Sequence, residues 1–99
     1  MLANDDCNQF DDLSVELQNE LLEWIKQNLV PIKSFNLKHD SYGLKHLVRF
    51  RDGKRPYLTN GQFKGAMLRA GYRVQDMNAQ NWKFNISERS PAFKKAVRP

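Results

Sequence analysis

Apolar residues recur at three- and four-residue spacing between residues 14 and 30, which is the spacing of one face of an α-helix. This stripe consists of Leu17, Leu21, Leu22, Ile25 and Leu29. Trp24 lies beside the stripe and is expected at the edge of the core. The oxygens of Asp12 to Ser14 can cap the helix, and Pro31 stops it at Leu29 or Val30. The pattern predicts an amphipathic helix.

A second helix is expected after a connector over residues 31–39. Asp40 or Ser41 can cap this helix, which runs to about Arg51, and the turn pair Asp52-Gly53 ends it. The residues that repeat at helical spacing on its buried face are Leu44, Leu47 and Val48. We expect Lys45, His46 and Arg49 on its outer face.

A third helix has a distinct start and end. Thr59-Asn60-Gly61-Gln62 matches a capping box, in which the Thr hydroxyl and the Gln amide each satisfy a backbone group. Gly71 stands where a left-handed residue would end the helix. The apolar face between these two signals is formed by Phe63, Ala66, Met67 and Ala70.

The period changes after the third helix. Residues 72–74 and 82–86 alternate apolar and polar side chains, and turn-forming residues separate them, which predicts a two-stranded antiparallel hairpin. Ser90-Pro91 then opens a short helix to about Val97. The predicted fold class is α+β: three helices, a hairpin and a short C-terminal helix. This is the element order of a winged helix.

The chain has 99 residues, the size of one small domain. Residues 1–10 are polar and without period, so we expect a disordered acidic N-terminus followed by a single basic domain over 11–99. The single cysteine, Cys7, cannot form an internal disulfide. Without a signal-peptide pattern or a membrane-spanning apolar run, the expected location is the cytoplasm, with no membrane association.

The net charge of +5 is distributed unevenly along the chain. Residues 1–30 contain seven acidic residues and one basic residue, whereas residues 31–99 contain fifteen basic and four acidic residues. An acidic head on a basic body indicates an anionic partner, an internal pairing of charges, or both.

No pattern in the sequence indicates catalysis. His39 and His46 are seven residues apart, which on a helix would separate them by two turns, about 10 Å, too far to share a metal. Asp40 beside His39 could orient a general base, but the interpretation that Asp40 caps a helix is favoured. We therefore expect no enzymatic activity, no cofactor and no metal site.

The basic residues of the second half could form a face that displaces counterions from a phosphate backbone. The candidate nucleic-acid-binding residues are Lys45, Arg49, Arg51, Lys54, Arg55, Lys64, Arg69, Arg73 and Lys83. Tyr42 and Tyr57 are candidates for exposed stacking on bases, whereas Trp82 and Phe84 are expected in the core. The first hypothesis is a nucleic-acid-binding protein that makes mostly backbone contacts, with DNA favoured over RNA.

Opposite the apolar face of the third helix, Gly61, Gly65 and Leu68 form a smooth strip. Each helical glycine costs up to about 1 kcal/mol relative to alanine, so the pair requires an explanation. A strip without side chains lets another surface approach closely. The second hypothesis is therefore a protein interface at Gly61, Gly65 and Leu68, used by an inhibitor or adaptor, against an acidic protein surface or in a homodimer.

Four motifs together resemble a family of small, largely uncharacterised proteins carried by bacteriophages, plasmids and other mobile elements. They are Ser41-Tyr42-Gly43-Leu44-Lys45-His46, Tyr57-Leu58-Thr59-Asn60-Gly61-Gln62-Phe63, Ala70-Gly71-Tyr72 and Phe84-Asn85-Ile86-Ser87. The resemblance spans about residues 20–95 and implies a cytoplasmic protein of a bacterial host. It implies no activity and carries over no functional residue. The segment from Arg49 to Pro56 is more basic here than the family pattern leads us to expect.

Mobile elements keep small proteins for two main purposes. One is the management of their own DNA, and the other is the binding of a host defence enzyme to disable it. The two hypotheses correspond to these purposes.

Overall fold

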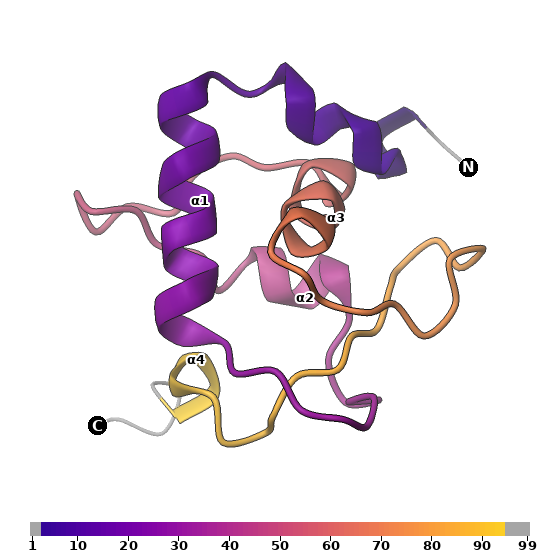
Figure 1. Ribbon diagram of the computed structural model, residues 1–99. Helices are drawn as coiled ribbons and strands as arrows, with labels where there is room; N and C mark the ends of the chain where they lie inside the picture. Colours follow the sequence, from indigo (N-terminus) through magenta and orange to yellow (C-terminus); the bar gives the residue numbers. More distant parts are fainter. Residues whose placement is uncertain (1–2, 95–99) are drawn as a thin grey trace.

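The computed structural model describes residues 3–94 and shows helices grouped around α3 (Figure 1). The elements are the 3-10 helices η1 (Ala3–Asp5) and η2 (Cys7–Asp12), and the α-helices α1 (Val15–Asn28), α2 (Ser41–Lys45), α3 (Asn60–Arg69) and α4 (Pro91–Lys94). α3 packs against η1, η2, α1 and α2, so most of its circumference is covered. No helix among the described residues has the length and apolar content needed to cross a membrane.

The first predicted helix is confirmed as α1. The Ser14 hydroxyl caps it by accepting the N–H of Leu17, and its last turn ends at Leu29. The residues on its buried side are Leu21, Trp24, Ile25 and Leu29. Leu17 departs from the prediction because it lies at the exposed start of the helix, where 40% of its surface remains accessible.

The third predicted helix is confirmed as α3, including both of its end signals. The Thr59 hydroxyl accepts the backbone N–H of Gln62, and the Gln62 side chain accepts that of Thr59. Gly71 has a φ of 94°, as the left-handed position requires. Three of the four residues on the predicted apolar face are buried, namely Phe63, Ala66 and Met67, whereas Ala70 is exposed.

The second helix is shorter than predicted. Asp40 caps α2 by accepting the N–H of Gly43, but the helix ends at Lys45 instead of near Arg51. A tight turn follows, in which Phe50 donates its N–H to Lys54 and Gly53 adopts a φ of 80°. The backbone groups from Phe50 onward are therefore committed to this turn and cannot extend the helix.

The predicted hairpin is wrong. Among residues 3–94 there is no β-strand, and the two predicted strands share one isolated bridge, between Val74 and Phe84. The connector before α2 takes the hydrogen bonds that a longer hairpin would need: Ile32, Asn36 and Ser41 donate N–H groups to the carbonyls of Asn85, Phe84 and Trp82. The 82–86 segment therefore lies between two partners and forms a ladder with neither.

The fold class is corrected accordingly. The described part of the chain is helical with irregular connections, and an architecture without a hairpin is not a winged helix. Pro91 opens α4 as predicted, while the expected continuation to Val97 falls outside the described residues. Trp82 and Phe84 are buried in the core as expected, with Phe84 in edge-to-face contact with Phe63.

The N-terminal segment packs on α3, in contrast to the disordered acidic N-terminus expected over residues 1–10. Phe10 is buried in the core, and Asp5 is buried as well. The backbone of the N-terminal segment lies directly against α3. A side-chain carbon on Gly61 would collide with the backbone of Asp6, and one on Gly65 with the backbone of Cys7. These glycines are therefore explained by the close approach of the chain's own N-terminal segment.

We predict that Gly65→Ala lowers the free energy of unfolding by about 1–3 kcal/mol, because the added methyl group overpacks this contact. Urea denaturation followed by circular dichroism measures the change. Gly43→Ala is the matched control, since a methyl group there meets Asp40 at an ordinary 3.7 Å and should be neutral or stabilising by up to about 1 kcal/mol. A Gly65→Ala protein as stable as the control would contradict the packing described.

Candidate nucleic-acid interface

Cationic and aromatic side chains gather where α2 meets the segment before α3. We call this the tyrosine–basic surface, and it consists of Tyr42, Lys45, His46, Arg55 and Tyr57. Its two rings are unusually open, with 54% of Tyr42 and 86% of Tyr57 exposed. Both tyrosines line one recess, and large exposed aromatic side chains grouped in this way are typical of a binding surface.

Local contacts order the α2 part of this surface. The ring of Tyr42 meets the imidazole of His46 edge-on at 5.0 Å between centroids, and Lys45 Nζ lies 4.8 Å from the Tyr42 centroid. Arg49 supports the end of α2 by donating from Nη1 to the carbonyls of His46 and Val48. The surface is thus presented on a fixed backbone.

The cations of this surface repel one another. Partial burial and the charge of Arg55 both lower the pKa of Lys45. Desolvation, followed by the charges of Lys45 and Arg55, lowers the pKa of His46. No carboxylate of the described residues counteracts either of these pKa shifts. A cluster of like charges held without a counterion favours the binding of an anion.

A recess of about 390 Å³ opens beside the tyrosine–basic surface. Tyr42, Lys45 and Tyr57 line one part of it, and polar residues from the N-terminal segment, the start of α3 and the loop before residue 82 line the rest. These polar lining residues are Asn4, Asp5, Thr59, Asn60, Gln80 and Asn81. The size lies at the lower end of the range of small-ligand sites, about 300–1,000 Å³.

Asn60 is the centre of the hydrogen bonds in this recess. Its Nδ2 donates to Asp5 Oδ1 at 2.9 Å, to the Gln80 carbonyl at 3.1 Å and to Asn81 Oδ1 at 2.9 Å. Asn60 is buried, and its Oδ1 accepts no hydrogen bond within the described part of the chain. A buried acceptor left in this state costs about 1–3 kcal/mol, so Asn60 Oδ1 lacks a donor among the described residues.

Lys64 is placed in the interior, unlike the surface position predicted for it. Its side chain is fully buried, Nζ donates to the Asp5 carbonyl at 3.1 Å, and Nζ lies 4.6 Å from the Trp82 ring centroid. Desolvation lowers the pKa of Lys64, and the nearby charges of Asp5, Cys7 and Asp6 oppose this pKa shift. The N-terminal segment thus separates Lys64 from any external phosphate.

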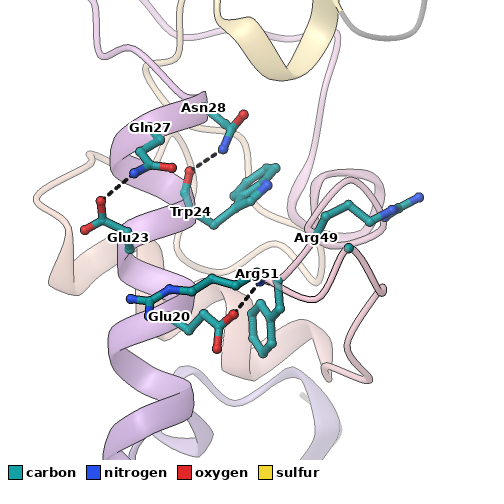
Figure 2. Close-up of a pocket in the computed structure, with 9 residues that line it drawn as sticks. Glu20, Glu23, Trp24, Gln27, Asn28, Arg49 and Arg51 are labelled. Atoms are coloured by element: carbon teal, nitrogen blue, oxygen red, sulfur yellow. Dashed lines mark hydrogen bonds between the residues drawn. The ribbon is translucent and has the colours of Figure 1, made fainter.

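Arg49 and Arg51 lie at a hollow of about 610 Å³ between α1 and the turn after α2 (Figure 2). Figure 2 shows Arg51 extending toward α1 and Arg49 directed away from it. Glu20 Oε2 accepts the backbone N–H of Arg51 at 2.6 Å, and Glu23 lines the same hollow. Because Glu20 and Glu23 line this hollow together with the arginines, it is a weaker anion site than the tyrosine–basic surface.

The remaining predicted cations are dispersed. Arg69, at the C-terminal end of α3, forms an ion pair with Asp11 at 3.6 Å. Arg73 donates to the Lys33 carbonyl and lies over the Phe35 ring. Lys54 is exposed, and Lys83 is half-buried. Of the nine predicted residues, Lys45 and Arg55 are therefore placed together in one hollow with the exposed side chain of Tyr57.

The predicted protein-interface strip is covered by the chain itself. Gly61 and Gly65 are buried beneath the N-terminal segment, and Leu68 is left exposed at the end of the strip. His39 contacts Glu88 at 3.1 Å and stacks on Phe93, while Asp40 caps α2. Among the described residues, no group of three or more His, Cys, Asp or Glu side chains could hold a metal ion.

Asn60, Gln80 and Asn81 were missed by the sequence analysis. Gln80 and Asn81 follow Asn60 by 20 and 21 residues along the chain, and no spacing rule joins the three residues. Comparisons with models of protein families, with curated proteins and with solved structures found no match to this chain.

We predict that Arg55→Gln raises the pKa of His46 toward its ordinary value, because one of the two neighbouring positive charges is removed. The shift should be incomplete, since desolvation is the largest cause of the depression. Titration of the imidazole protons by NMR measures it. Lys54→Gln removes the same charge from the adjacent position and should leave the pKa of His46 unchanged; equal responses to both substitutions would contradict the charge cluster.

Proposed function

We propose that this protein binds single-stranded nucleic acid through the tyrosine–basic surface. Lys45 and Arg55 contact phosphates, and Tyr42 and Tyr57 stack on unpaired bases. The observation that carries the proposal is the clustering of unneutralised cations beside two exposed tyrosine rings. Nucleic acid is the partner that offers regularly spaced anions together with flat aromatic faces.

The charge cluster supports the phosphate part of the proposal. Lys45, His46 and Arg55 line one shallow hollow of about 260 Å³ together with Tyr57. A phosphate there relieves the mutual repulsion of the cations and releases counterions from the nucleic acid. The guanidinium of Arg55 can donate two parallel hydrogen bonds to phosphate oxygens.

The tyrosines support a single-stranded partner over a duplex. A ring that is 86% exposed, as in Tyr57, can stack on a splayed base, and such stacking contributes about 1–3 kcal/mol per base. Duplex DNA keeps its bases stacked on one another and offers no such face. Reading the major groove requires an exposed helix or ribbon.

Neither α2 nor α3, the helices that adjoin the tyrosine–basic surface, meets that requirement. α2 has five residues, and α3 is covered by the N-terminal segment, α1 and α2. Neither helix can enter a major groove as a recognition helix does.

The resemblance to mobile-element proteins fits this proposal. Such elements must manage their own nucleic acid in the cytoplasm of a bacterial host, where single strands are accessible. The alternative of a protein partner no longer has the glycine strip in its favour, because the N-terminal segment occupies it. An acidic protein surface therefore remains as an outcome of the test below.

We predict that Lys45→Glu weakens the binding of a fluorescent single-stranded oligonucleotide about tenfold or more, because it reverses a phosphate-contacting charge. Tyr57→Ala should weaken binding by about 1 kcal/mol or more through the loss of stacking. Fluorescence anisotropy at roughly 50 and 200 mM salt measures both effects. Circular dichroism verifies that each variant is folded.

Lys26→Glu is the matched control. Lys26 is exposed on α1 and lies with Arg69 at the C-terminal end of α3, whereas the tyrosine–basic surface adjoins its N-terminal end. The same charge reversal there should change affinity far less. Equal losses for Lys26→Glu and Lys45→Glu would show non-specific attraction, and absence of binding at low salt would redirect the proposal to an acidic protein surface.

A further inference from the structure

We infer that the recess beside the tyrosine–basic surface receives one unpaired nucleobase that carries an exocyclic amino group, such as cytosine or adenine. This inference rests on the proposed function and adds a base preference to it. Two observations support it: the position of the recess, and the balance of hydrogen-bond donors and acceptors around Asn60.

The recess and the tyrosine–basic surface share residues, so one strand can occupy both. Tyr42, Lys45 and Tyr57 line the recess, and Lys45 and Tyr57 also line the neighbouring hollow that contains Arg55. A base in the recess would therefore have tyrosine rings beside its face and cations close to its phosphate. The recess volume of about 390 Å³ is that of a small-ligand site.

The hydrogen bonds around Asn60 offer more acceptors than donors. Asn60 Nδ2 has two hydrogens but faces three acceptors, on Asp5, Gln80 and Asn81. The Asn60 Oδ1 acceptor receives no hydrogen bond within the described residues. A ligand that brings donors is therefore favoured over one that brings further acceptors.

The orientation of the Asn60 amide follows from its neighbours. A carboxylate only accepts hydrogen bonds, so the nitrogen end of the amide must face Asp5. Asp5 is itself fixed, because its Oδ2 accepts from Gln80 Nε2 at 3.2 Å and its carbonyl accepts from the buried Lys64. The excess of acceptors is thus built into the packing of the N-terminal segment on α3.

Bases differ in whether their exocyclic group is a hydrogen-bond donor or an acceptor. At the exocyclic position, cytosine and adenine present an NH₂ donor where uracil and hypoxanthine present a carbonyl acceptor; the donor of the latter two is on the adjacent ring nitrogen instead. Near the acceptors of Asn81 and Gln80, which belong to exposed residues, the amino group gains a hydrogen bond and the carbonyl is repelled. Proteins that read unstacked bases commonly use this kind of hydrogen bond together with stacking.

The test compares oligodeoxynucleotides of equal length that differ at this edge: oligo-dC with oligo-dU, and oligo-dA with oligo-dI. Anisotropy is measured at pH 7.5, where cytosine is unprotonated, with a label at the 5′ end. The expected result is affinity about three- to tenfold higher for dC than for dU and for dA than for dI, the value of about one hydrogen bond.

Asn81→Leu should reduce the ratio of dC to dU affinity, since it removes one acceptor and keeps the bulk of the side chain. Asn78→Leu is the matched control, because Asn78 is exposed in the same loop and does not line the recess. A preference that survives Asn81→Leu, or that falls equally in Asn78→Leu, would place base discrimination elsewhere.

The remaining outcomes separate the two proposals. Binding of every oligonucleotide with equal affinity for dC and dU, and for dA and dI, overturns the base recess and leaves the proposed function standing. Absence of binding to all four at low salt overturns the proposed function, and the base recess fails with it. The wild-type comparison requires no variant, so the inference stays testable if Asn81→Leu does not fold.

Discussion

The close packing of the N-terminal segment on α3 is the contact on which the rest of the structure depends. Gly61 and Gly65 allow the backbone of the N-terminal segment to touch α3, and this close approach brings Phe10 into the core. It also places Asp5 against Asn60 and covers Lys64. One contact therefore completes the core, builds the polar part of the recess and removes a cation from the surface.

The distribution of charge follows from the same packing. Asp11 pairs with Arg69, Glu20 binds the backbone at Arg51, and Asp5 lies beside Lys64, so much of the acidic head is used internally. The internal pairing of charges predicted from the sequence is thus present for part of the acidic head, and the anionic partner stays a prediction. The tyrosine–basic surface is where cations cluster without such compensation, and it is there that an anionic partner gains most.

Local signals predicted α1 and α3 well, because helical periodicity, the capping box at Thr59 and the glycine at 71 act within a few residues. The hairpin failed because alternation shows that the 82–86 segment is extended but not which segment pairs with it. The predicted site included Lys45, Arg55 and both tyrosines. The Asn60 cluster could not be predicted because its residues are distant in sequence and are brought together by the fold. Gly61 and Gly65 were the one feature of the sequence that indicated a segment packed on α3.

The most direct test of the account is an NMR titration of ¹⁵N-labelled protein with an oligo-dC strand at low salt. We predict that the backbone amide signals of Tyr42, Lys45, His46 and Tyr57 shift, together with the side-chain amide signal of Asn81. The backbone amide signal of Arg69 should stay in place. Shifts confined to the Arg51 hollow or spread evenly over all basic residues would contradict the assignment of the tyrosine–basic surface as the binding site.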